Sequence, residues 1–184
     1  AGYTWDNVIQ KMSDEQWYAI VDCHMTAPFR ILRAAYPIIK AQAQADAALE
    51  REVFRKVVNI SSVSALNGNA GQMNYSSAKA GVIGMTRALA REWGRLKVNV
   101  NAVAFGFIET RMTRADAHAG ATVNIEGRDI RVGISPENAR TFAQRNPLGR
   151  PGTVQEAADA VYLFCSPESN YITAQTIAVA GNLQ

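Results

Sequence analysis

The chain has 184 residues, of which 48% are hydrophobic and 19% are charged, and its formal net charge is +3. This composition is typical of one folded domain with a single core and excludes two large domains. The basic residues within 87–97 are interrupted by Glu92, which favours a solvated helix face over a nucleic-acid surface. No apolar run is long enough to predict a membrane span.

The cysteines and histidines are too scattered to predict a disulfide framework or a metal site. Cys23 and Cys165 are far apart, and neither belongs to a CxxC or Cys/His cluster. Two isolated cysteines are typical of a reducing compartment, so we expect a cytoplasmic protein. His24 and His118 are not spaced as ligands on one helix face, and we expect no metal.

The first half of the chain predicts one long helix and one strand. The helix begins at a capping box formed by Ser13 and Gln16 and continues to about residue 40, with a bend at Pro28. Residues 41–56 are interpreted as an exposed extension of this helix followed by a turn. Residues 57–61 are short, apolar and β-branched, which indicates a buried strand.

The second half continues this alternation of helices and strands. We expect a helix over 75–94, a strand over 98–105, a helix that begins at a capping box on Thr153, and a strand over 176–179. The long connection over 108–150 contains a predicted hairpin with strands at 123–126 and 129–132. Strands that alternate with helices predict an α/β fold with a parallel sheet.

Three side chains form a candidate site for proton transfer. Tyr75 and Lys79 are four residues apart, so they lie on one face of their helix. A nearby cation lowers the pKa of a tyrosine, which can then exchange a proton with a carbonyl or alcohol oxygen. Ser62 follows the strand over 57–61, at the sheet edge where open α/β proteins bind ligands. Its hydroxyl is placed to hold a substrate oxygen, whereas Ser61 and Ser64 are explained as turn residues.

The residues around this candidate site resemble a known family. Residues 59–62 (Asn-Ile-Ser-Ser) and 69–81 (Asn-Ala-Gly-Gln-Met-Asn-Tyr-Ser-Ser-Ala-Lys-Ala-Gly) resemble the active-site block of the classical short-chain dehydrogenases/reductases. The resemblance continues, in the order typical of the family, at residues 98–103, 106–110, 147–152 and 169–175. It covers nearly the whole chain and is greatest for the 3-oxoacyl-thioester (3-oxoacyl-acyl carrier protein) reductase branch.

The resemblance implies a fold and an activity. The fold is the C-terminal half of a Rossmann-type doubly wound parallel sheet, a single partial catalytic domain over 1–184 with a long loop or lid at 108–150. The activity is that of an oxidoreductase that interconverts a ketone and a secondary alcohol with NAD or NADP. A 3-oxoacyl or 3-hydroxyacyl thioester is the substrate we expect.

The resemblance also implies roles for particular residues. Tyr75 is the expected acid/base and also an expected cofactor-binding residue. Lys79 lowers the pKa of Tyr75 and binds the nicotinamide ribose, and Ser62 orients the substrate carbonyl. Gly106, Ile108 and Thr110 are expected to line the nicotinamide carboxamide and a nearby phosphate. The helices at roughly 13–40 and 75–94 are expected to pair with a second subunit in a homodimer or homotetramer.

Three departures from the family pattern affect these expectations. His24 stands where the family usually has the asparagine of its catalytic tetrad. It keeps a main-chain carbonyl role, adds a titratable group to the catalytic relay, or is simply packed and hydrogen-bonded in the helix. Phe105 replaces the usual proline before Gly106. The connection after Thr110 is longer than in the reductase branch and is either a substrate lid or a surface insertion without function.

A fourth departure concerns the cofactor. The glycine-rich loop that receives the pyrophosphate and the residue that selects NAD or NADP are absent from the sequence. Ala1 and Gly2 resemble the end of the motif that closes the fourth strand of the family, so we expect a partial polypeptide. The alternative function is a cofactor-free structural partner subunit or a fragment of such an enzyme. The retained Ser62, Tyr75 and Lys79 argue against that alternative.

Overall fold

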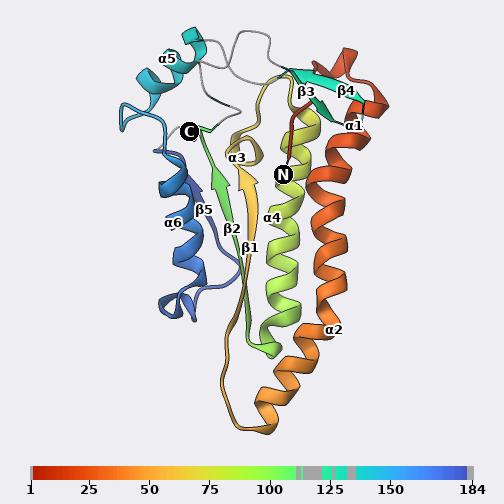
Figure 1. Cartoon of the computed structure of the whole chain (residues 1–184), viewed down its shortest axis with the longest axis vertical. Helices are drawn as coiled ribbons and strands as arrows, with labels where there is room; N and C mark the ends of the chain where they lie inside the picture. Colours follow the sequence, from red (N-terminus) through yellow and green to blue (C-terminus); the bar gives the residue numbers. More distant parts are fainter. Residues whose placement is uncertain (1, 111–112, 114–121, 126, 132–135, 182–184) are drawn as a thin grey trace.

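The computed structural model describes all residues except 1, 111–112, 114–121, 126, 132–135 and 182–184. The elements in chain order (Figure 1) are α1 (Asp14–Val21), α2 (Ala27–Ala48), β1 (Arg55–Ser62), α3 (Ser64–Asn67), α4 (Met73–Trp93), β2 (Val98–Phe105), β3 (Thr122–Ile125), β4 (Arg128–Arg131), α5 (Pro136–Arg145), α6 (Val154–Cys165) and β5 (Thr176–Val179). One π turn (Asp22–Thr26) separates α1 from α2, and short 3-10 turns lie at Ile9–Lys11, Gly94–Leu96 and Pro167–Ser169.

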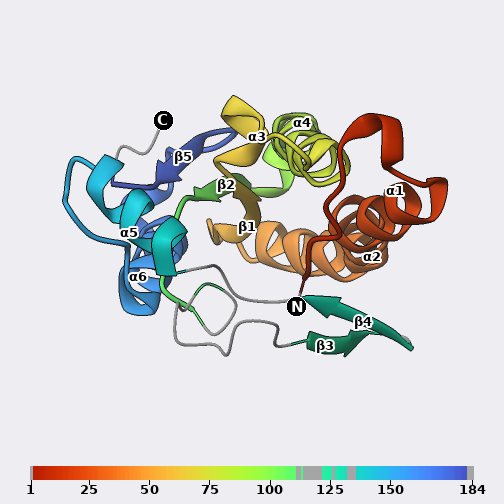
Figure 2. The same ribbon diagram turned by 90° about the horizontal axis from the view of Figure 1, so that it is seen from above.

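A parallel three-stranded sheet in the order β1-β2-β5 forms the centre of the fold, which confirms the predicted α/β class. β1 and β2 pair over their full lengths, so that Ser62 lies opposite Phe105. Helices α4 and α6 lie on opposite sides of the strands, and α2 runs beside α4 (Figures 1 and 2). Among the described residues, no strand pairs with the outer edge of β1.

Strand β2 supplies side chains to hydrophobic clusters on both faces of the sheet. Val98 and Val100 pack with Ala90 and Trp93 of α4, and side chains of α2 complete this cluster. Val103 packs with residues of α6 on the opposite face. Seven of the eight β2 residues are buried, and the two polar ones, Asn99 and Asn101, donate their side-chain amides to the carbonyls of Asn170 and Ile172. β2 has the predicted bounds of 98–105.

The predicted long helix is interrupted rather than bent. Both predicted capping boxes are present, at the starts of α1 and α6. Beyond Val21, however, the chain makes the π turn, in which the Ala27 amide bonds to the Asp22 carbonyl. Pro28 comes next. It has no amide hydrogen to donate to the carbonyl of the residue four positions earlier, so the α-helical hydrogen-bond pattern is interrupted here. The helical extension beyond residue 40 is confirmed, because α2 ends at Ala48.

An ion-pair cluster fixes the turn between α2 and β1. The Asp46 carboxylate is buried and accepts hydrogen bonds from Arg51 at 2.7 Å and from Arg55 at 2.6 Å. These arginines, Arg55 first, hold the pKa of Asp46 below its ordinary value. Residue 55 begins β1, so the strand starts two residues earlier than the sequence predicts.

The long connection contains the predicted hairpin and one helix that sequence analysis missed. β3 and β4 pair antiparallel, with bounds one residue earlier than predicted. Helix α5 follows; only three of its ten residues, Ala139, Phe142 and Ala143, are apolar, which is too few to mark a helix by apolar periodicity. The lid function of 108–150 stays a prediction, and His118 lies outside the described residues.

Two features that would indicate a class of function are absent from the described ranges. No helix there is both long and apolar enough to cross a membrane. Within the same ranges, no group of three His, Cys, Asp or Glu side chains is arranged to hold a metal ion.

Candidate active site

The fold brings the three predicted proton-transfer residues together. Ser62 ends β1, and Tyr75 and Lys79 lie in the first two turns of α4. The Lys79 Nζ lies 5.7 Å from the centroid of the Tyr75 ring and donates to the Ile60 carbonyl at 3.0 Å. The Ser62 hydroxyl accepts from the Ser64 amide at 3.2 Å and lies close enough to Tyr75 to lower the pKa of its phenol. All three side chains therefore meet at the carboxyl end of β1.

Two buried hydrogen bonds fix α4 against β1. The Asn59 amide donates to the Thr86 hydroxyl at 2.8 Å, and the Ser61 hydroxyl donates to the Lys79 carbonyl at 2.9 Å. Both strand residues lie on the face of β1 that α4 covers, because alternate residues share a face. Ser61 is thus a link between strand and helix rather than a simple turn residue.

Burial shifts the titration of both helix residues. Desolvation raises the pKa of Tyr75; the Ser62 hydroxyl lowers it, and the nearby Asp6 carboxylate raises it further. Desolvation also lowers the pKa of Lys79. The sequence predicts that Lys79 lowers the pKa of Tyr75, whereas in this structure burial dominates and the net shift is upward. The phenol therefore keeps its proton at neutral pH, as an acid that donates to a carbonyl requires.

Residues 3–7 lie along the start of α4 and were missed by sequence analysis. Asn74 is fully buried, and its amide donates to the carbonyls of Trp5 and Gln16, each at 3.1 Å. The Gln72 amide donates to the Asp6 carboxylate at 2.8 Å. These contacts join residues far apart in the sequence, so spacing does not reveal them. The one signal in the sequence that could have indicated these contacts is Asn74 itself, a polar residue on the buried face of the helix.

The predicted cofactor residues follow β2 directly. The Gly106 amide donates to the Val179 carbonyl at 3.0 Å, and Ile108 is buried and forms a bridge with Gly152. The Thr110 amide donates to the Thr113 hydroxyl at 2.7 Å. Gly106 and Ile108 thus lie at the same end of the sheet as Ser62, while the Thr110 contact closes a tight turn just beyond them.

Gly106 allows a close approach that a larger residue would prevent. A Cβ at this position would lie 2.6 Å from the Ala180 Cβ and 2.8 Å from its Cα, so the backbone must move. Phe105 does not disturb this approach, because its side chain packs in the α6 cluster. Phe105 is therefore half-buried against the core and does not enter the loop that follows.

We expect Gly106→Ala to destabilise the protein by about 1–3 kcal/mol, because overpacking shifts the backbone. Displacement of the loop also weakens cofactor binding. Gly84→Ala is the matched control, because a Cβ there meets nothing within 4 Å. Replacing glycine with alanine at an exposed helix position increases the free energy of unfolding by up to about 1 kcal/mol. Denaturant unfolding of both variants measures the difference. Equal stability of the two variants would contradict the close approach.

The site has groups that fit the ribose of a nicotinamide cofactor. Lys79 is only 8% exposed, and its ammonium donates to Ile60 alone among the described residues. A buried ammonium has three hydrogens to donate, so it can take further acceptors such as ribose hydroxyls. Gly106 lies at the same end of the sheet, where its lack of a side chain lets the backbone at Ala180 come close. The residues present therefore fit the nicotinamide end of the cofactor.

Comparison with known proteins agrees with this geometry. A family model described as enoyl-(acyl carrier protein) reductase, one of those for the short-chain dehydrogenases/reductases, matches residues 1–182. The chain belongs to the short-chain dehydrogenase/reductase family. The predicted family and its Rossmann-like α/β fold are therefore confirmed.

Several curated relatives are named 3-oxoacyl-[acyl-carrier-protein] reductase. Those of Vibrio cholerae and Escherichia coli are 39% and 37% identical over 183 residues, which cover 100% of this chain and 64% of each relative. That of Chlamydia muridarum is 35% identical over 184 residues, which cover 100% of this chain and 62% of the relative. The chain thus spans less than two thirds of the length of these relatives.

Proposed function

We propose that the native protein is an NAD(P)-dependent oxidoreductase that reduces a 3-oxoacyl thioester, carried on an acyl carrier protein, to the 3-hydroxyacyl thioester. The observation that carries this proposal is the meeting of Ser62, Tyr75 and Lys79 at the carboxyl end of a parallel sheet. The names of the relatives supply the substrate class.

The chain's own residues perform the proton transfer. The Tyr75 hydroxyl gives its proton to the substrate carbonyl oxygen, and the Ser62 hydroxyl donates a hydrogen bond to the same oxygen. When bound, a reduced nicotinamide would supply the hydride that the carbonyl carbon needs to become a secondary alcohol. Lys79 stabilises the tyrosinate that remains until it regains a proton from water. The raised pKa of Tyr75 supports the reducing direction, because it keeps the donor protonated.

The test uses the native polypeptide. Its intact mass is measured first, to establish the length of the chain that is assayed. Titration with NADH and then NADPH identifies the cofactor, and an acetoacetyl thioester serves as substrate. We expect binding of at least one cofactor and its oxidation only in the presence of thioester. A protein that binds neither cofactor would instead be the structural partner subunit, the second candidate function.

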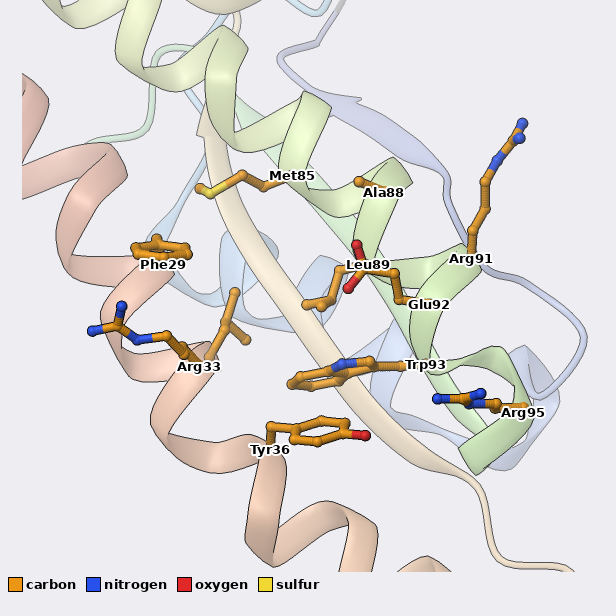
Figure 3. Close-up of a pocket in the computed structure, with 11 residues that line it drawn as sticks. Phe29, Arg33, Tyr36, Met85, Ala88, Leu89, Arg91, Glu92, Trp93 and Arg95 are labelled. Atoms are coloured by element: carbon orange, nitrogen blue, oxygen red, sulfur yellow. The ribbon is translucent and has the colours of Figure 1, made fainter.

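We also propose that α2 and α4 pair with a second copy of the chain. The groove between them (Figure 3) has a volume of about 710 Å³ and is lined mainly by apolar and aromatic side chains. Figure 3 shows Phe29 and Tyr36 on α2 facing the side of α4 that carries Leu89 and Trp93. Of the α4 residues that line the groove, Met85 is the nearest to Tyr75 in sequence. The two residues are roughly 15 Å apart along the helix axis, so the groove is separate from the candidate active site.

The charges of this groove favour a second copy as its occupant. Its charged lining residues are Glu92 and three arginines, Arg33, Arg91 and Arg95. In a two-fold contact each surface meets its own copy, so a groove with both signs can complement itself. We expect a dimer or tetramer by light scattering, and a smaller species for Phe29→Glu but not for Val53→Glu, another exposed apolar residue. A monomeric wild type would exclude this pairing.

We place the protein in the cytoplasm, in keeping with its cysteines. Cys23 and Cys165 are both free thiols. Unpaired thiols suit a reducing compartment. Fractionation of the source cells tests this assignment, and recovery from an oxidising compartment would contradict it.

A further inference from the structure

The π turn lies beside the proposed proton donor and carries His24. π turns are rare in proteins, and those that occur are often at functional sites. The His24 side chain is only 6% exposed. A side chain so buried needs a hydrogen-bond partner, and its protonation state depends on that partner.

The hydrogen bond of His24 determines its tautomer. Its Nε2 lies 2.7 Å from the Tyr3 carbonyl oxygen. A carbonyl only accepts, so Nε2 carries the hydrogen and donates it. Desolvation lowers the pKa of His24, the Tyr3 carbonyl opposes that shift, and the positive charge of Lys79 adds to it. His24 is therefore neutral at pH 7, and its single N–H is bonded to Tyr3.

The imidazole is packed between two segments of the chain. Its ring is perpendicular to the Tyr75 ring, with centroids 4.9 Å apart and an interplanar angle of 86°. Gly2 lies so close to the imidazole that a Cβ there would be 2.5 Å from the His24 Cε1. His24 thus connects the segment at Gly2 and Tyr3 to the ring of Tyr75.

We propose that His24 is a positioning residue, which holds the Tyr75 ring in the orientation that brings its hydroxyl to Ser62 and to the substrate oxygen. The inference rests on the proposed role of Tyr75 as proton donor. His24 itself carries no proton in the reaction, since its one N–H is used by Tyr3. Its contribution is the perpendicular ring contact, kept in place by the Tyr3 bond and by the absence of a side chain at residue 2.

Three substitutions separate the ring contact from the hydrogen bond. His24→Phe keeps a ring, His24→Gln keeps an N–H donor, and His24→Ala removes both. We expect kcat to fall roughly 10- to 100-fold in His24→Ala with little change in KM, and to fall less in His24→Phe, which keeps a ring against Tyr75, than in His24→Gln, which does not. We expect the plot of kcat against pH to keep the same rising and falling portions in all three variants as in the wild type. Equal large losses in all three variants, with one of these portions missing, would instead make His24 a proton carrier and overturn the proposal.

A second readout does not depend on turnover. In protein with ring-labelled tyrosines, the NMR signals of Tyr75 are assigned with Tyr75→Phe. We expect separate signals for the two ring edges in the wild type and averaged signals in His24→Ala, because the ring then turns freely. This result stands even if Tyr75 proves not to be the proton donor.

Gly2→Ala tests the same contact from its other side. Gly2 is exposed, so this variant leaves the core intact should His24→Ala fail to fold. We expect Gly2→Ala to displace the imidazole and change the Tyr75 signals, but to add nothing in the His24→Ala background. Wild-type Tyr75 signals in Gly2→Ala would overturn the proposal.

Discussion

Replacing Tyr75 with phenylalanine is expected to lower kcat by a factor of roughly 10²–10⁴, the range for a lost general acid. The fold is retained, because the substitution removes one hydroxyl and leaves the ring in contact with His24 and Lys79. Cofactor affinity is also largely retained, since Lys79 and Gly106 are unchanged. Steady-state kinetics and cofactor titration on one preparation measure both quantities.

Tyr162→Phe is the matched control for this substitution. Tyr162 is on α6 and 69% exposed, far from the site, so the same chemical change there leaves kcat unaltered. A Tyr75→Phe enzyme with the turnover of the control would exclude Tyr75 as the proton donor.

Lys79→Met is expected to remove activity without removing stability. Loss of the cation from a water-poor site costs kcat about 10²–10³-fold, as for other preorganised electrostatic groups. The wild-type ammonium, however, is buried beside a single carbonyl. Methionine has a similar shape and no desolvation penalty, so the melting temperature stays the same or rises. An exposed counterpart, Lys40→Met, changes neither quantity.

The stability difference between the wild type and Lys79→Met is expected to change with pH in a definite direction. Burial depresses the pKa of Lys79 in the folded protein, so the unfolded chain binds more protons just below the ordinary lysine value of 10.5. Wild-type stability relative to Lys79→Met therefore rises as the pH increases through that window. A difference that is constant with pH would mean that Lys79 is not desolvated.

Local sequence patterns predicted the elements that depend on local physics. Capping boxes and apolar periodicity located the starts of α1 and α6 and the exact span of β2. The parallel sheet followed from the alternation of strands and helices. Tyr75, Lys79 and Ser62 were predictable because a four-residue helical spacing and a strand end are both visible in the sequence.

The features that sequence analysis missed depend on tertiary contacts. Pro28 indicated an irregular helix, but the π turn before it is visible only in the backbone. Asn74 holds the carbonyl of a residue 69 positions away, which no periodicity reveals. The direction of the Tyr75 pKa shift depends on how much water the fold excludes, whereas sequence spacing shows only that Lys79 is near.

The two links between β1 and α4 have a consequence for how members of this family can differ from one another. Asn59–Thr86 and Ser61–Lys79 fix the helix against the strand at two points, which prevents both sliding and rotation. The distance from Ser62 to Tyr75 is therefore independent of the exposed loop between them. Residues 68–70, the exposed loop after α3, can change in length or composition while the proposed catalytic geometry is kept. A change at Asn59, buried and remote from any substrate, would disrupt that geometry at once.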